Sequence, residues 1–137
     1  MQREFPRDIA ALQEIFEFVQ DRFKAAGLDS SLSFDADLII EELFTNMVKY
    51  NKDGSHPIQI TLEVVPTQMT IQLCDRNVDP FDMTQAPDVD TSASGSERTP
   101  GGLGIHFVRQ IADKFSYDYK NRTSCITVVK RLEDSDV

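Results

Sequence analysis

The fold is decided by one stretch of this chain, Gly101-Gly-Leu-Gly-Ile-His-Phe-Val-Arg-Gln110. Three glycines in four positions allow the backbone to come close to a ligand, and the exposed N–H groups at a helix start bind anions. The stretch opens a helix that we expect over residues 103–114. It is neither common glycine fingerprint, because a polar loop precedes it and Ile105 and His106 stand where a phosphate loop has Lys and Ser or Thr. A flexible loop that ends in a helix is the alternative.

A second helix, expected over residues 33–50, carries two side chains that suit chemistry. Glu42 and Asn46 are four residues apart, so they share one face of the helix, at the border of its apolar stripe. A carboxylate and an amide at the edge of a core are costly unless something satisfies them. They are therefore candidates for a site, and a solvated helix flank is the alternative.

The segments on either side of this helix are regular. Apolar residues at three- and four-residue steps predict a first helix over 8–26. Alternation with period two predicts strands over 58–64 and 69–74. These strands should pair as an antiparallel hairpin with one face on a core.

The C-terminal half begins with a long polar segment. Residues 76–102 are rich in Asp, Ser, Thr, Pro and Gly, which is typical of a functional lid or of a disordered segment. After the third helix, strands are expected over 115–119 and 125–132, and the tail 133–137 is expected to fray. Helices and strands are thus segregated along the chain, which favours an α+β two-layer sandwich.

The composition limits the partners and the compartment that we expect. With 23 acidic and 14 basic residues among 137, the formal charge is −9, which argues against direct binding of nucleic acid or of an anionic membrane. A basic protein partner and a small anionic ligand are both compatible with this charge. No apolar run approaches the ~18 residues of a membrane-spanning helix. Since the N-terminus also has no apolar signal region, we expect a cytoplasmic protein of one domain.

The two cysteines, Asp75 and the two histidines are also residue types that can carry chemistry. Cys74 and Cys125 each lie in a strand-like run without metal-ligand spacing, so we expect a buried, reduced pair, with a disulfide as the alternative. Asp75 closes the second strand, where its carboxylate could accept a hydrogen bond from an amino group such as that of adenine. A turn-forming Asp is the alternative. His56 and His106 have no partner at metal spacing, and we expect no site role for them.

Taken in this order, the segments resemble the small anti-sigma-factor serine kinases, a branch of the GHKL (Bergerat-fold) ATPase superfamily. The resemblance extends from Phe5 to Leu132. It rests on five stretches. Phe5-Pro-Arg-Asp8 resembles the lead-in to the first helix, Glu41-Glu-Leu-Phe-Thr-Asn46 resembles the N box, and Asp75 with Pro80-Phe81-Asp82 resembles the first glycine box. Gly101 to Gln110 resembles the second glycine box, and Thr127-Val-Val-Lys-Arg-Leu132 resembles the last strand. It implies one domain over 1–137, with a mixed, largely antiparallel sheet covered on one face by about three helices. It also implies an ATP lid over 83–100.

The resemblance further implies a role for each matching residue. Glu42 corresponds to the general base for the attacking hydroxyl, and Asn46 to an Mg²⁺ ligand that acts through its amide oxygen. Asp75 corresponds to the residue that recognises adenine. The other implied ATP contacts come from the two glycine boxes: Asn77, Gly101, Gly102, Leu103 and Gly104. Lid contacts to phosphate are expected among Ser94, Ser96, Arg98 and Thr99.

The first glycine box departs from the family pattern in two ways. Asn77 stands where the family has Gly, and Asn tolerates a positive φ better than most residues, so the turn can survive. The box is also one residue longer than usual. If Pro80 and Phe81 are the anchor, Arg76 rather than Asp75 falls at the aspartate position, so both assignments stay open.

The resemblance implies an Mg²⁺- and ATP-dependent protein serine/threonine kinase. Its partners would be a sigma factor, which it holds, and an antagonist protein, which it phosphorylates; a homodimer is compatible with the family. The main alternative is a catalytically weak or inactive module that regulates a partner without phosphoryl transfer, as the altered box suggests. A detached ATPase domain of a sensor histidine kinase is a third interpretation.

Overall fold

The computed structural model describes residues 1–29, 32–50, 55–80 and 102–132. Its elements are, in chain order, β1 (Gln2–Phe5), the 3-10 helix η1 (Ile9–Ala11), α1 (Leu12–Ala25), α2 (Ser33–Tyr50), β2 (Ile58–Val65), β3 (Gln68–Arg76), α3 (Gly102–Ile111), β4 (Lys114–Lys120) and β5 (Thr123–Arg131). The lid expected over 83–100 and the tail 133–137 lie outside the described residues.

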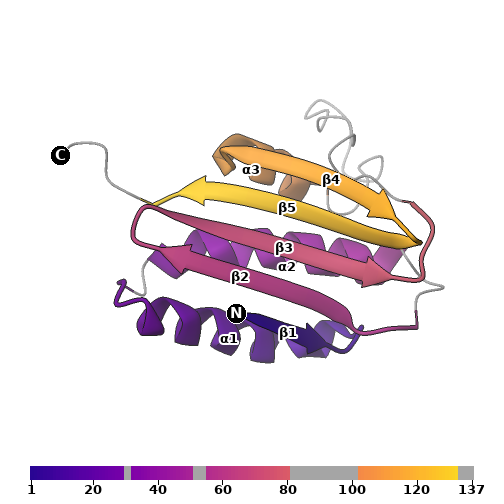
Figure 1. Cartoon of the computed structure of the whole chain (residues 1–137), viewed down its shortest axis with the longest axis horizontal. Helices are drawn as coiled ribbons and strands as arrows, with labels where there is room; N and C mark the ends of the chain where they lie inside the picture. The colour runs from indigo at the N-terminus through magenta and orange to yellow at the C-terminus, as the bar shows by residue number, and fades with distance from the viewer. Residues whose placement is uncertain (30–31, 51–54, 81–101, 133–137) are drawn as a thin grey trace.

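The strands form one five-stranded sheet with the order β1-β2-β3-β5-β4, and each neighbouring pair is antiparallel. Figure 1 shows helices α1, α2 and α3 together on one side of this sheet. The predicted α+β two-layer sandwich is therefore confirmed. The predicted hairpin is also present, because β2 and β3 pair along their length, with Leu62 opposite Ile71.

The core lies between the sheet and the helices. Along β2 and β3, alternate residues are buried, as expected for strands with one covered face. Helix α2 is the central helix, since it packs against α1, α3 and β3. Its largest core contributions are Ile39, Ile40, Leu43, Phe44 and Met47, all at most 1% exposed. Burying such side chains contributes about 1.5–3 kcal/mol each and holds α2 firmly on the sheet.

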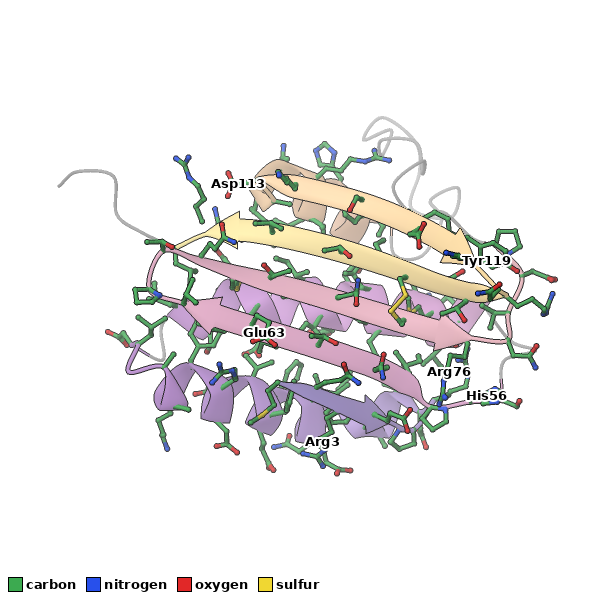
Figure 2. All side chains as sticks on the ribbon, viewed as in Figure 1. Arg3, His56, Glu63, Arg76, Asp113 and Tyr119 are labelled. Carbon is green, nitrogen blue, oxygen red and sulfur yellow. A yellow bond between two sulfur atoms is a disulfide. The ribbon has the colours of Figure 1, made fainter. Side chains whose placement is uncertain are left out.

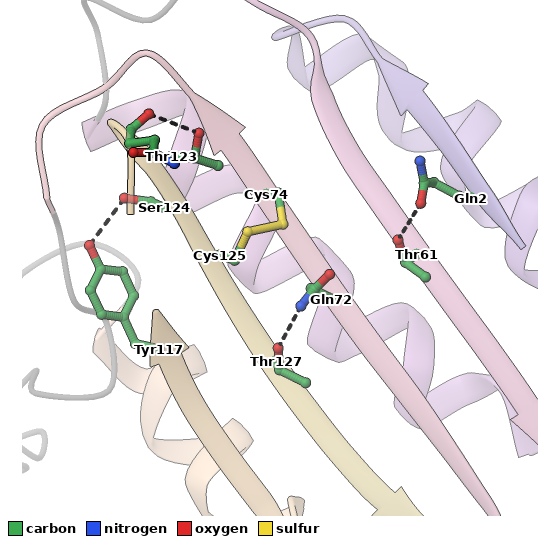
Figure 3. The surroundings of a disulfide bond; sticks show 10 residues. Gln2, Thr61, Gln72, Cys74, Tyr117, Thr123, Ser124, Cys125 and Thr127 are labelled. Atoms are coloured by element: carbon green, nitrogen blue, oxygen red, sulfur yellow. Dashed lines mark hydrogen bonds between the residues drawn. A yellow bond between two sulfur atoms is a disulfide. The ribbon is translucent and has the colours of Figure 1, made fainter. Parts of the chain in front are cut away.

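The opposite face of the sheet is polar and carries a disulfide. Gln72 and Thr127 lie opposite each other on β3 and β5, and the Gln72 Nε2 donates a hydrogen bond to the Thr127 Oγ1 at 3.1 Å (Figure 3). Two residues away along each strand, on the same face, Cys74 and Cys125 are directly opposite, with their Cα atoms 4.1 Å apart, and their sulfur atoms are bonded. The expectation of two reduced thiols is therefore wrong. The pairing of β3 with β5 brings together two cysteines that are 51 residues apart in the sequence.

An additional strand and a shorter third helix also differ from the sequence-based expectation. Strand β1 was not expected, since only one of its four residues is apolar; it forms because Phe5 is buried and pairs with Ile58 of β2. Helix α3 ends at Ile111 rather than at residue 114, because Lys114 already pairs with Val129 in the β4–β5 hairpin. Within the described residues, no helix combines the length and the apolar character needed to cross a membrane.

Candidate functional site

The candidate site residues come from three elements that meet at one end of the sandwich. The C-terminal ends of α2 and β3 and the N-terminal end of α3 point toward the same end of the sheet (Figure 1). Figure 2 places His56 and Arg76 at this end, whereas Asp113, which follows α3, lies at the other end. Segments that are far apart in the sequence therefore converge here.

Glu42 and Asn46 form a direct pair on α2. The Asn46 side chain is buried, at 3% exposure, and its Nδ2 donates a hydrogen bond to the Glu42 Oε2 at 2.9 Å. Burial raises the pKa of Glu42, and this effect outweighs the hydrogen bond from Asn46 and the positive charge of Lys49, which both lower it. The predicted shared face is confirmed, and Asn46 is not part of a solvated flank.

Lys49 is a residue of this site that the sequence analysis missed. It lies three residues after Asn46 on α2, and its charge acts on Glu42. The spacing along α2 could have indicated Lys49, because residues three and four apart on a helix are neighbours on its surface. A cation beside a carboxylate and an amide gives this helix face a mixed charge that suits a bound phosphate and metal together.

Asp75 and Arg76 end β3 on opposite faces of the sheet. Asp75 faces the helices, is fully buried, and forms an ion pair with Arg7, whose Nη1 donates to the Asp75 Oδ1. Arg76 points to the polar face, where its Nη2 lies 2.8 Å from the Glu4 Oε2. The longer glycine box leaves either Asp75 or Arg76 at the position of the family's aspartate. Of these two residues, only Asp75 lies on the face of the sheet that α2 covers.

Arg7 is the second residue that the sequence analysis missed. Its side chain is 12% exposed, and its Nη2 donates to the backbone carbonyl of Met47 at 3.1 Å. Its Nη1 also lies 3.5 Å from the carbonyl of His56. Arg7 precedes Asp75 by 68 residues, so no local pattern could have indicated this ion pair.

The turn after β3 is held by the turn between β4 and β5. Asn77 adopts a φ of 57°, which confirms the expectation that Asn replaces Gly here with a positive φ. The Arg122 Nε donates to the Asn77 Oδ1 at 3.1 Å, and the Val78 N–H donates to the Arg122 carbonyl at 3.0 Å. The Tyr119 hydroxyl donates to the Val78 carbonyl at 2.7 Å. The described part of the altered glycine box, up to Pro80, thus contains a turn that hydrogen bonds at Asn77 and Val78 hold in place.

The second glycine box begins α3. Gly102 is the first residue of this helix, and Leu103 and Gly104 follow in its first turn. The first N–H groups of a helix have no partner within the helix, and they favour anions. The helix is anchored by Ile105 and Val108, which are both buried in the core. The remaining expected contacts lie outside the described residues: Ser94, Ser96, Arg98, Thr99 and Gly101.

One comparison with known proteins, the scan of family models, identifies the type of domain. The family model described as histidine kinase-like ATPase domain matches residues 5–130. Among solved structures, the chain is similar to the Acinetobacter baumannii histidine kinase AdeS at 16% sequence identity and a TM-score of 0.48, over 98% of this chain and 68% of that chain. A search of curated proteins finds no significant match.

Proposed function

The chain belongs to the histidine kinase-like ATPase domain family, and on that basis we propose that it is an Mg²⁺- and ATP-dependent protein serine/threonine kinase. Membership of the family implies ATP binding. The choice of Ser or Thr as acceptor, the antagonist protein as substrate and the sigma factor as a bound partner are our proposals. They follow from the resemblance of the boxes to those of the anti-sigma-factor kinases.

The observation that supports this proposal most is the pair formed by the buried Asn46 and the half-buried Glu42. Because the Asn46 amide nitrogen donates to Glu42, the amide plane is fixed and its oxygen is directed away from that carboxylate. A neutral amide oxygen beside a carboxylate is a hard donor set, which fits Mg²⁺. The residues present therefore fit the metal that the family usually uses.

The other residues would hold the nucleotide around this pair. Asp75 is a buried acceptor at the end of β3, which suits the amino group of a base. The N–H groups of Gly102, Leu103 and Gly104 at the start of α3 suit phosphate oxygens. Mg²⁺ bound with the nucleotide would neutralise charge on the phosphates during transfer.

Glu42 is our candidate for the general base. Its task would be to accept the proton of the acceptor hydroxyl while that hydroxyl oxygen attacks the phosphoryl group. A carboxylate with a raised pKa is a better base, provided that it is deprotonated at the working pH. The activity should therefore rise with pH through the pKa of Glu42 and then level off.

The proposed partners are consistent with the charge of the chain. A formal charge of −9 favours protein partners with basic surfaces and speeds their association at low salt. Charge alone favours basic partners of any kind. The sigma factor and the antagonist enter through the resemblance.

Replacing Glu42 tests the proposal. In Glu42→Gln we expect ATP affinity within about threefold of the parent, and a loss of phosphoryl transfer of at least about 10²-fold, the usual contribution of a general base. Glu41→Gln is the matched control, because Glu41 is the exposed neighbour on the same helix. Undiminished transfer from labelled ATP in Glu42→Gln would remove Glu42 from the mechanism. An acid-labile product would indicate phosphohistidine instead of phosphoserine or phosphothreonine.

One observation favours the alternative of a binding module without transfer. Asp75 is fully buried and already paired with Arg7, so it could serve the fold rather than a base. A module of this kind would hold its partner equally well with and without ATP, and equally well in Asn46→Ala. Strict dependence of a pull-down on Mg²⁺-ATP would count against it.

A further inference from the structure

Two residues other than glycine adopt the left-handed backbone conformation and are joined by a hydrogen bond at the end of β3. Asn77, in the turn after β3, has a φ of 57°, and Arg122, in the turn between β4 and β5, has a φ of 58°. The Arg122 Nε donates to the Asn77 Oδ1 at 3.1 Å. We propose that Arg122 is a positioning residue that holds the turn at Asn77 in the conformation that binds Mg²⁺-ATP. This inference rests on the nucleotide site of the proposed function.

The turn between β4 and β5 is a place where glycine would be favoured over arginine. Lys120 and Thr123 pair in the hairpin, so Asn121 and Arg122 form a two-residue loop in which both φ angles are positive. Loops of this kind prefer Asn followed by Gly, because most L side chains are strained in the left-handed region. The Asn is present, but Arg122 occupies the place of Gly. A strained residue persists only where its surroundings hold it, so its contacts point to its role.

The hydrogen bonds of Arg122 reach three consecutive residues after β3. Besides the bond to Asn77, its carbonyl accepts from the Val78 N–H at 3.0 Å, and its Nη1 lies 3.2 Å from the Asp79 Oδ1. The ion pair with Asp79 contributes little, because both side chains are mostly exposed, at 56% and 83%. The carbonyl of Arg122 belongs to the backbone and is present with any side chain. The bond to Asn77 is therefore the main contribution of the arginine side chain.

This bond selects one conformation for Asn77. Asparagine tolerates a positive φ but also adopts negative values, and its side chain can hydrogen-bond to nearby backbone groups instead. A donor fixed at the Oδ1 favours the arrangement that the structure shows. On the other side of the turn, the Tyr119 hydroxyl donates to the Val78 carbonyl at 2.7 Å, and Val78 is 4% exposed. Side chains from both arms of the β4–β5 hairpin thus order the turn.

The ordered turn lies next to the candidate site. Asp75, whose buried carboxylate ends β3, precedes Asn77 by two residues. Figure 2 places Tyr119 at the same end of the sandwich as Arg76, the last residue of β3. A change in this turn would alter the direction in which the chain leaves β3. A turn that is ordered before the nucleotide arrives spares the entropy that binding would otherwise lose, so its order should appear as affinity.

Arg122→Gly separates this role from a purely structural one, because it should affect stability and affinity differently. Glycine takes a positive φ without strain, so we expect the urea midpoint to stay unchanged or to rise. Calorimetric titration of the full chain with Mg²⁺-ATP should nevertheless show an affinity about tenfold lower, the worth of about one hydrogen bond. A midpoint that falls together with the affinity, or a variant that does not fold, would assign Arg122 to the stability of the hairpin and overturn the inference.

Asn121→Gly is the matched control. It introduces glycine at the other central position of the same turn, where φ is 53°, and leaves the arginine side chain in place. Its affinity for Mg²⁺-ATP should stay within about threefold of the parent, because no hydrogen bond to the turn after β3 is removed. An equal loss of affinity in Asn121→Gly and Arg122→Gly would overturn the inference, since the flexibility of the hairpin would then explain both.

The coupling between Arg122 and Asn77 is a second test. In Asn77→Gly the acceptor of the hydrogen bond is absent, so adding Arg122→Gly should lower the affinity for Mg²⁺-ATP by a smaller factor than it does in the parent. Equal factors in the two backgrounds would overturn the inference, because they would mean that Arg122 acts without Asn77.

The outcomes also distinguish this inference from the proposed function. A parent protein that binds no Mg²⁺-ATP contradicts both. A parent that binds Mg²⁺-ATP, together with an Arg122→Gly variant that binds it equally well, contradicts only the role of Arg122.

Discussion

The charged form of Asp37 lowers the stability of the folded state. It lies on α2, and its buried Oδ1 has no hydrogen-bond partner among the described residues. Burial, with a smaller effect from the charge of Glu41, raises the pKa of Asp37 from 3.8 to about 6. Between these two values the folded state binds a proton that the unfolded state has released. Stability should therefore fall as pH rises from about 4 to about 6.

Asp37→Asn should remove this loss. A shift of this size corresponds to about 3 kcal/mol for a fully desolvated group, and the partial exposure of Asp37 reduces the expected gain to about 1 kcal/mol at pH 7. At pH 3.5 the gain should nearly vanish, because the parent carboxyl is then mostly protonated in both states. Urea unfolding at the two pH values measures the difference. Asp35→Asn, in the first turn of α2, is the control and should give no gain at pH 7, since the helix dipole favours a carboxylate there.

The site residues differ in how far the sequence could predict them. Glu42 and Asn46 could be paired from their spacing, because a helix fixes the geometry of residues four apart. The positive φ of Asn77 followed from the chemistry of one residue. The pairing of Arg7 with Asp75 could not be predicted, since it depends on where the whole fold places the N-terminal segment relative to β3.

At the scale of elements, the disulfide joins two strands that are not neighbours in the sequence. Cys74 of β3 and Cys125 of β5 close a loop with a sequence separation of 51 residues, which contains the long polar segment and α3. In the chain-entropy model, a loop of this length stabilises the folded state by up to about 4 kcal/mol. The effect comes from restricting the unfolded chain.

Reduction of this bond should therefore lower the urea midpoint of the protein. Thiol titration would establish that the bond has opened, and the free energy of unfolding should then fall by about 2–4 kcal/mol. The control is Cys74→Ala combined with Cys125→Ala, whose midpoint should not respond to reductant. Equal midpoints for the oxidised and reduced parent would show that strand pairing alone holds β3 to β5.

The hydrophobic pattern predicted the elements with local periodicity well, but it did not predict which distant strands pair. The bounds of α2 and the β2–β3 hairpin followed from apolar spacing and alternation. Strand β1 has no alternation, so its position depends on the edge that β2 offers. The β3–β5 pairing crosses a long segment of chain, which is why the register of the two cysteines could not be predicted.

At the scale of the whole molecule, the candidate site lies where several long-range contacts meet. Arg7 joins the N-terminal segment to α2 and β3, and the β4–β5 turn holds Asn77. The elements that carry these residues also contribute to the common core between the sheet and the helices. A ligand that binds at this end should therefore stabilise the molecule as a whole, since its contacts exist only when these elements are in place.

Nucleotide binding should thus be visible as a gain in global stability. At 100 times its Kd, Mg²⁺-ATP should raise the free energy of unfolding by about 2.7 kcal/mol. The gain should shrink when Mg²⁺ is removed, and in Asn46→Ala it should become the same with and without Mg²⁺, because the proposed metal ligand is then absent. The ligand-induced shift is compared within each variant, so any intrinsic destabilisation by the loss of the buried Asn46 cancels. If millimolar Mg²⁺-ATP leaves the thermal midpoint of the parent unchanged, the altered first glycine box has disabled the site. The binding-module alternative would then replace the kinase.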